Sequence, residues 1–509
     1  MKHSTKLLLN TIASYGRIIV NIVVTLISTR LALKYLGAND FGLYNLIAGV
    51  VLMLSFLNSS LQISSQRYFS IAIGERDKEK LGKYFNANLS IHIAISAVIG
   101  FLLLSLLYPL FNGFLNIPTG KEFVAVNIYL VMVLSTIVTI GTIPYSAIIT
   151  AREDLVALSC INIIYCFGKL VAAVSLVFIT NHLLVTYSIL MLAAVFFKML
   201  LEILWSRKHY EETKLRKRQL LNKSICREML GFVGWNTLGS IAVLFRNQGI
   251  AIALNLFFGT IVNAAYGIAH HVNALVLSFA GTITTVFSPM IIQAKGAGDE
   301  KKMLYSAILS SKLSFLLSSI MALPILMFLE KLLNLWLTEV PEHTIIFCKL
   351  NIYSFLIQQL YPGINRAVYA SGKIKGYQIS TAILLISIIP IGAWLFSIGY
   401  PPASILLVMM VSQILVMLST VYYAWKHCRL KATDFLAKSV VLPVLLFVSE
   451  LTVFIWVGRT LQIEVTIFTM IILSSIAMLL YSASYFFLIL NRNEQISMLN
   501  IINNLKRKR

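Results

Sequence analysis

Nine basic side chains interrupt long apolar runs in this sequence, and they have the clearest capacity for chemistry. They are Arg17, Arg30, Arg67, Lys169, Lys198, Arg246, Lys312, Lys349 and Arg366. Acidic residues are almost absent from these runs: Glu202 lies one turn from the end of one, and Glu450 lies in another near the C-terminus. Cations without carboxylate partners bind anions, and several Arg and Lys together suit a multiply charged phosphate group. The pattern therefore favours an anionic ligand over a cationic one.

The nine cations differ in depth within their runs. Lys169 and Arg246 fall near the middle of their runs. If each run is a helix that crosses a membrane, these positions lie about 15 Å from either membrane surface, so we expect both side chains to line a cavity. Arg17, Lys198 and Lys312 lie at intermediate depth, where ligand binding and simple packing both remain open. The remaining four cations lie near the ends of their runs, where long side chains reach the headgroups.

Amide and imidazole groups accompany the cations. Asn21 shares a helical face with Arg17, and Gln358 and Gln359 lie at mid-depth in their run. Such amides bind sugar hydroxyls or join helices by hydrogen bonds, and the second role is the commoner one. His270 and His271 are adjacent, about 100° apart on a helix, so only one of them can fully face a cavity. A protonation switch or a hydrogen-bonded packing role fits either histidine.

The composition predicts helices that cross a membrane. The 509 residues are 58% hydrophobic and only 12% charged, whereas about a quarter of a soluble domain is charged. The apolar runs have the length that an α-helix needs to cross about 30 Å of hydrocarbon. Fourteen spans are predicted, at 8–33, 41–70, 85–110, 123–149, 156–180, 184–204, 232–258, 261–293, 303–329, 344–370, 377–398, 404–425, 439–458 and 466–490. The fold class is an all-α integral membrane protein.

Charge between the spans predicts the orientation. If the N-terminus is cytoplasmic, 29 Lys and Arg residues lie in cytoplasmic segments and four lie outside: Lys34, Lys121, Lys331 and Arg459. This bias follows the positive-inside rule, so we expect both termini in the cytoplasm. The net charge of +22 then reflects topology, and no nucleic-acid partner is expected.

A stretch near the N-terminus returns later in the chain at a constant offset of 222 residues. Gly37 matches Gly259, Tyr44 matches Tyr266, and Asp77 matches Asp299. An internal duplication with six spans in each copy predicts two parallel, pseudo-symmetric lobes followed by two further helices. The predicted boundaries are 1–204 for the N-lobe, 205–231 for a basic cytoplasmic linker, 232–425 for the C-lobe, 426–490 for the last two helices and 491–509 for a basic tail.

Two basic segments and two matched prolines complete the expected architecture. The linker and the tail are expected to lie at the cytoplasmic surface near anionic headgroups, and Met498, Ile501, Ile502 and Leu505 give the tail one apolar helical face. Pro144 and Pro362 interrupt corresponding spans. They are interpreted as matched hinges or as kinks that only shape the packing.

Motifs for catalysis or metal binding are missing from the sequence. There is no phosphate loop of the GxxxxGK[ST] type and no HExxH, and the five cysteines are scattered without CxxC spacing. We expect no catalytic residue, no metal site and no cofactor. The chain is predicted to be a transporter and not an enzyme.

The stretch LGANDFGLYNL, the GERDKEK loop and their echo in the second half resemble the polysaccharide-transporter branch of the multidrug/oligosaccharidyl-lipid/polysaccharide (MOP) exporter superfamily, the Wzx-type O-antigen and capsule flippases. The resemblance implies a MATE-like fold in the inner membrane. It implies translocation of an undecaprenyl-pyrophosphate-linked oligosaccharide by alternating access, with a polysaccharide polymerase and glycosyltransferases as partners. The cations Arg17, Lys169, Lys198, Arg246 and Lys312 would then meet the diphosphate.

Two alternatives remain open at this point. A cation-coupled multidrug exporter of the MATE type would need a carboxylate deep in the membrane, and the first twelve spans offer none at mid-depth. A lipid II type flippase would share the cationic cavity. Neither the sugar nor any coupling ion leaves a readable motif in the sequence.

Overall fold

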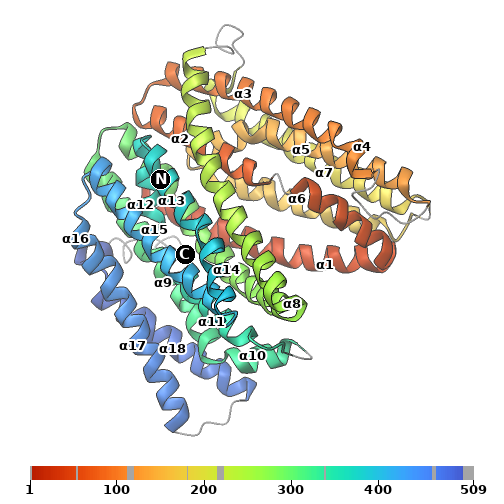
Figure 1. Ribbon diagram of the computed structural model, residues 1–509. Coiled ribbons are helices and arrows are strands. Elements are labelled where there is room, and N and C mark those ends of the chain that lie inside the picture. Colours follow the sequence, from red (N-terminus) through yellow and green to blue (C-terminus); the bar gives the residue numbers. More distant parts are fainter. Residues whose placement is uncertain are drawn as a thin grey trace. The chain divides into compact units, whose positions relative to one another are not determined.

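The computed structural model describes residues 3–52, 55–111, 120–179, 181–214, 223–337, 340–460 and 466–496, and these ranges are almost entirely helical (Figure 1). Within them, eleven helices are long and apolar enough to cross a membrane, and the helix Thr344–Gln358 is a shorter apolar one. The structure confirms the predicted all-α membrane fold class.

The chain divides into two compact units. The N-terminal unit comprises Leu9–Ser240, and the C-terminal unit comprises Ile241–Arg509 together with Met1–Leu8. Apart from the first residues of α1, the N-terminal unit contains α1 (His3–Leu52), α2 (Ser55–Gly74), α3 (Lys78–Ser105), α4 (Leu107–Pro109), α5 (Glu122–Ala151), α6 (Leu155–Ser175), α7 (Leu183–His209) and the 3-10 turn η2 (Glu211–Thr213). The division falls inside α8 (Lys223–Gly296).

The C-terminal unit continues from α8 with shorter and more interrupted helices. They are α9 (Glu300–Met327), α10 (Leu329–Trp336), α11 (Thr344–Gln358), α12 (Pro362–Ser371), α13 (Lys375–Ile386), α14 (Ile388–Ser397), α15 (Ser404–Cys428), α16 (Ala432–Phe435), the π-helical segment η4 (Leu436–Val441), α17 (Leu442–Thr460) and α18 (Ile467–Leu488). Each of the fourteen predicted spans coincides with helix in the described residues. The short helix α10 was not predicted.

The duplicated stretch folds in the same way in both copies. Gly37 has φ 78° and ψ 165°, and its match Gly259 has φ 82° and ψ −171°. This backbone region is accessible almost only to glycine. Asp77 and Asp299 each cap the next helix, accepting a hydrogen bond at 2.9 Å from the backbone N–H three residues later. The repeat therefore preserves the backbone geometry of the turns as well as the residue types.

The matched prolines have different structural roles. Pro144 lies inside the continuous helix α5. Pro362 is the first residue of α12, after a break that follows Gln358 and contains Tyr361. Proline tolerates a first helical position because its missing N–H has no helical partner there. The predicted span 344–370 is thus interrupted at Pro362, whereas α5 continues through Pro144.

Helix packing inside each unit positions the predicted site residues. In the N-terminal unit α5 contacts α2, α3 and α7, and α6 contacts α7 (Figure 1). The core of this unit also brings Ala32 and Leu36 of α1 into one buried cluster with Ala172 and Ala173 of α6. In the C-terminal unit α9 contacts α12, α17 and α18.

The predicted linker and tail are described in part. Within 205–231 the structure contains the end of α7, η2 and the start of α8, while residues 215–222 lie outside the described residues. The tail is described only to residue 496, so the apolar face of Met498, Ile501, Ile502 and Leu505 lies outside the described residues. The predicted domain boundaries stay predictions.

Candidate functional site

Three helices of the N-terminal unit bring together most of its predicted site residues. We define the N-terminal cation cluster as Arg17 and Asn21 of α1, Tyr165, Cys166 and Lys169 of α6, and Lys198 of α7. Asn21 Oδ1 accepts hydrogen bonds from Lys169 Nζ at 3.5 Å and from Cys166 Sγ at 3.2 Å. Arg17, one turn before Asn21, interacts electrostatically with Cys166. Asn21 is exposed and Lys169 half-buried, so a ligand can reach these groups.

Tyr165 lies between two of these cations. Lys169 Nζ is 5.3 Å and Lys198 Nζ is 5.5 Å from the centre of its ring. The negative face of an aromatic ring attracts an ammonium group at such distances. Tyr165 therefore holds two lysines from different helices close together without neutralising either of them.

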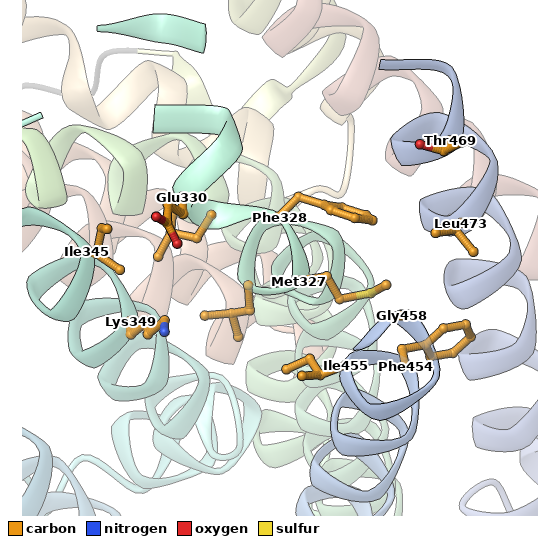
Figure 2. Close-up of a pocket in the computed structure, with 12 residues that line it drawn as sticks. Met327, Phe328, Glu330, Ile345, Lys349, Phe454, Ile455, Gly458, Thr469 and Leu473 are labelled. Carbon is orange, nitrogen blue, oxygen red and sulfur yellow. The ribbon is translucent and has the colours of Figure 1, made fainter. Parts of the chain in front are cut away.

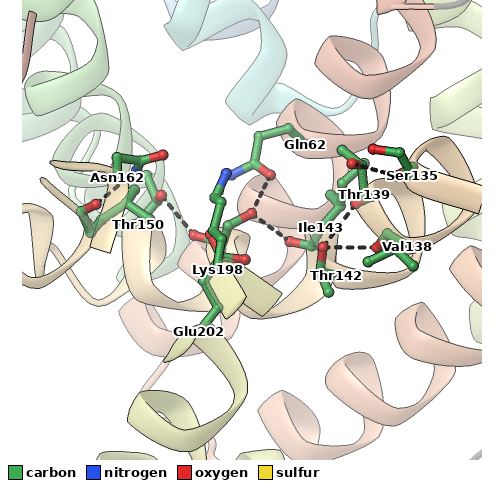
Figure 3. A network of polar contacts seen from close by, with 12 residues as sticks. Gln62, Ser135, Val138, Thr139, Thr142, Ile143, Thr150, Asn162, Lys198 and Glu202 are labelled. Atoms are coloured by element: carbon green, nitrogen blue, oxygen red, sulfur yellow. Dashed lines mark hydrogen bonds and ion pairs between the residues drawn. The ribbon is translucent and has the colours of Figure 1, made fainter. Parts of the chain in front are cut away.

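Lys198 also has an acidic neighbour. Its Nζ is 3.6 Å from Glu202 Oε1, and Glu202 is 1% exposed (Figure 3). Because α7 continues to His209, Glu202 lies about two turns inside the helix. The sequence-based placement of Glu202 one turn from the helix end is therefore wrong, and part of the charge of Lys198 is balanced within the chain.

Arg17 and Lys169 differ from Lys198 in their acidic neighbours. Among the described residues, no carboxylate lies within ion-pair distance of either side chain. An unpaired cation in a membrane-spanning helix costs about 3 kcal/mol at mid-depth. No described carboxylate therefore balances Arg17 or Lys169, and anion binding by the N-terminal cation cluster stays a prediction.

The C-terminal unit holds a second group around one arginine. We define the C-terminal cation cluster as Arg246, Tyr266 and His270 of α8 together with Tyr361. Arg246 Nε and Nη2 donate to Asn247 Oδ1 at 3.1 and 2.9 Å. Arg246 interacts electrostatically with Tyr266, Tyr361 and His270. Within the described residues it has no carboxylate partner.

The turn at Gly259 creates this second cluster. Arg246 and His270 lie at similar distances along the chain before and after Gly259. Their electrostatic interaction requires the two halves of α8 to lie against each other after the turn. The same glycine that marks the repeat therefore positions the arginine beside Tyr266.

The duplicated tyrosine has different neighbours in the two units. Tyr44 packs against Tyr187 with ring centres 5.2 Å apart and interacts electrostatically with Tyr165. Tyr266, its match, lies next to Arg246. Sequence analysis identified this pair only as a repeat identity and missed the place of Tyr266 beside Arg246. Tyr165 was also missed, although its position one turn before Lys169 was a signal for it.

Lys312 is placed differently from the expectation that it faces a ligand. It is 2% exposed, and its Nζ lies 2.9 and 3.2 Å from the two carboxylate oxygens of Glu494 and 3.3 Å from the carbonyl oxygen of Ile489. Glu494 follows the last predicted span, so a search for counter-charges within the spans could not find it. The prediction that the cations of the apolar runs have no carboxylate partner within the chain is therefore wrong for Lys312.

The remaining predicted contacts lie apart from the two clusters. Gln358 is half-buried and Gln359 is buried where α11 ends. Among the described residues, neither amide is hydrogen-bonded to a cation of either cluster. His271 is exposed and is an electrostatic neighbour of His270.

Comparison with known sequences gives one distant relative. No family model matches the chain. The uncharacterized membrane protein EpsK of Bacillus subtilis is 22% identical over 334 residues, which cover 63% of this chain and 62% of EpsK. The chain therefore spans about three fifths of the length of this curated relative.

Solved structures share the fold over most of the chain. A point mutant of a MATE transporter superimposes with a TM-score of 0.73 at 13% identity, covering 85% of this chain and 96% of that one. A point mutant of the Vibrio cholerae MATE transporter VcmN gives 0.73 at 16% identity, with 84% and 97% covered. A MOP superfamily transporter from Pyrococcus furiosus gives 0.71 at 12% identity, with 85% and 96% covered. The chain is thus a multi-pass membrane protein with the fold of the MATE transporters of the MOP superfamily.

Proposed function

We propose that the protein is a flippase that moves undecaprenyl-pyrophosphate-linked oligosaccharides across the inner membrane. One observation carries the proposal: within the described residues, Arg17, Lys169 and Arg246 lie in apolar helices without a carboxylate partner. A diphosphate supplies the missing negative charge and accepts several charge-assisted hydrogen bonds. The exposed amide of Asn21 is placed to bind a sugar hydroxyl beside it.

The fold supports transport by alternating access. A transporter of the same fold from Pyrococcus furiosus is described as having a binding pocket of reverse polarity that suggests a different function. Pocket charge can therefore vary on this scaffold. In the proposed mechanism the unpaired cations bind phosphate oxygens while the polyprenyl tail remains in lipid.

The proposal includes the orientation of the protein in the membrane and the enzymes that make and use its substrate. Both termini lie in the cytoplasm, because this orientation places most Lys and Arg residues of the loops inside. The substrate is loaded from the cytoplasmic leaflet after glycosyltransferases have built it, and a polysaccharide polymerase uses it on the other side. The chain itself acts as a transporter and not as an enzyme.

A flipping assay with purified protein tests the proposal. Liposomes containing the protein and a fluorescent undecaprenyl-pyrophosphate disaccharide are treated with dithionite, which reports the lipid exposed outside. Arg246→Gln and Lys169→Gln should each slow flipping by about tenfold or more, because a hydrogen bond to a charged group contributes about 1.5–3 kcal/mol. Arg30→Gln is the matched control: Arg30 is an exposed cation near a helix end, and this variant should flip like the wild type.

Equal flipping by all three variants would refute the role of the clusters. The assay also separates the two flippase types, since unlabelled lipid II competes only if the protein accepts that substrate. The glycan flippase is supported if an excess of lipid II leaves the rate unchanged.

A cation-coupled multidrug exporter is the second candidate, and one observation favours it. Glu202 is a buried carboxylate inside α7, the kind of group that could bind a proton or a cationic drug. Its proximity to Lys198 works against this role, because the lysine already supplies a positive charge. If the protein is such an exporter, Glu202→Gln abolishes efflux of ethidium from cells; without ethidium efflux by the wild type this candidate fails.

A further inference from the structure

Two adjoining cavities lie at one end of the helices of the C-terminal unit. The first, of about 320 Å³, is formed where the end of α9 meets α17 and α18. The second, of about 440 Å³, lies between α10 and the start of α11. Both are lined by Glu330, Ile345 and Lys349. We call the two together the rim groove.

One end of the rim groove is apolar. It is lined by Met327, Phe328, Phe454 and Leu473. Figure 2 shows these side chains away from Glu330 and Lys349. Gly458 of α17 also lines this end, and a Cβ atom at Gly458 would meet no heavy atom within 4 Å. The groove therefore has room beside Gly458 for a hydrocarbon chain.

The other end carries one positive and one negative charge. Lys349 is half-buried and Glu330 is exposed. Among the described residues, neither of them forms an ion pair. A headgroup at this end therefore finds a cation for its phosphate and an anion for an ammonium group.

The surrounding residues are typical of headgroup depth. Trp336 at the end of α10 is 58% exposed, and Trp456 of α17 is 66% exposed. Exposed tryptophans favour the membrane interface. The helix α10 buries Leu329 and Leu333 and exposes its charged residues, as an interfacial helix does. The charged end of the rim groove thus matches the headgroup layer, and its apolar end matches the acyl chains.

We propose that the rim groove binds a zwitterionic glycerophospholipid with a primary-amine headgroup. One acyl chain occupies the apolar end beside Gly458, the phosphate contacts Lys349, and the ammonium group contacts Glu330. Lipid chains gain little by leaving other lipid chains for an apolar pocket. Selection among lipids therefore depends on the two charges, and an anionic headgroup without an amine leaves Glu330 unpaired. This site is independent of the proposed transport function.

Native mass spectrometry of the detergent-solubilised protein tests the site. The probes are phosphatidylethanolamine and phosphatidylglycerol with identical acyl chains. The wild type should retain phosphatidylethanolamine about twofold to fivefold better, the range expected for one exposed ion pair. Glu330→Gln should remove this preference, while Lys349→Gln should reduce the retention of both lipids. Gly458→Leu should reduce retention of both by filling the apolar end.

Val453→Leu is the matched control for added volume, since Val453 is exposed on the same helix and does not line the groove. It should bind lipid like the wild type. The proposal is overturned if the wild type shows no preference, if Glu330→Gln keeps it, or if Gly458→Leu binds as well as the control. Arg246→Gln should keep lipid binding while flipping is slowed, so failure of the lipid site and failure of the flippase proposal are distinguishable.

Discussion

The five basic residues predicted to bind substrate are of two kinds, and the difference lies in their partners. Lys312 is enclosed with a carboxylate from the C-terminal segment, and Lys198 lies near a buried glutamate. Within the described residues, Arg17, Lys169 and Arg246 have no such partner. The first kind links segments of the chain, whereas the second is the kind to which the proposed function assigns the anion.

The pair of Lys312 and Glu494 should be a major contributor to the stability of the C-terminal unit. Lys312→Met or Glu494→Gln alone should lower the free energy of unfolding by about 3–5 kcal/mol, because each leaves a buried group without its partner. The double variant Lys312→Met/Glu494→Gln should recover part of this loss. Thermal unfolding in detergent, followed by tryptophan fluorescence, measures the effect.

The exposed pair of Lys83 and Glu79 is the control for this experiment. Its atoms are 2.7 Å apart, closer than the 2.9 Å of the buried pair, yet the side chains are 41% and 69% exposed. Lys83→Met should change the free energy of unfolding by about 0.5 kcal/mol or less, because solvent screens the pair. A similar loss at both sites would contradict the special role of the buried pair.

At the scale of the helices, the turns carry the clearest trace of the duplication. Gly37 and Gly259 reverse the chain with nearly the same backbone angles, although few side chains around them match. The cations do not follow the repeat, since the position matching Arg17 is Gly239 and the position matching Arg246 is Val24. The duplicated scaffold thus carries different charges in its two copies.

Replacing either turn glycine should destabilise the protein. Gly37→Ala and Gly259→Ala should each cost about 1–3 kcal/mol, because a Cβ atom is strained at these backbone angles. The control is Gly267→Ala in the helical part of α8, where a Cβ meets nothing within 4 Å. Alanine is the better helix former there, so the control should be neutral or more stable by up to about 1 kcal/mol.

The same thermal unfolding assay in detergent compares the three glycine variants. Gly37→Ala as stable as Gly267→Ala would show that the positive φ angle at Gly37 is not required. The proposed role of Gly259 in placing Arg246 also predicts slower flipping by Gly259→Ala than by Gly267→Ala.

For the whole molecule, the orientation in the membrane decides which leaflet supplies the substrate. Lys121 precedes α5 and forms an ion pair with Asp40, while Lys80 belongs to the GERDKEK loop and forms an ion pair with Glu75. Both lysines are accessible, Lys121 just before α5 and Lys80 in the first turn of α3, at helix ends that the positive-inside rule assigns to opposite sides.

Cysteine labelling in intact cells tests this orientation. In a variant without native cysteines, Lys121→Cys should react with a membrane-impermeant maleimide, and Lys80→Cys should react only after the cells are permeabilised. The reverse pattern would place the N-terminus outside. It would also require the substrate to be loaded from the opposite leaflet.

Much of the architecture could be predicted because it depends on local properties. Apolar length predicted the spans, and the fixed offset between Gly37 and Gly259 predicted the repeated turn. The sequence also predicted Asn21 beside a cation, from helical spacing. The π-helical segment η4 was not predicted, because hydropathy does not register the hydrogen-bond pattern within an apolar run.

The sequence by itself determined the membrane-spanning helices, their repeat and the presence of cations without acidic neighbours in the spans. Only the tertiary structure decided which cations stay unpaired. Glu494 pairs with Lys312 although the two residues are 182 positions apart in the sequence, and Tyr165 lies next to lysines of two helices. The periodicity of a helix shows which residues share a face, but the partner of that face depends on how the helices pack. For this reason charge composition predicted an anion site, whereas helix packing decided which of the cations have partners within the chain.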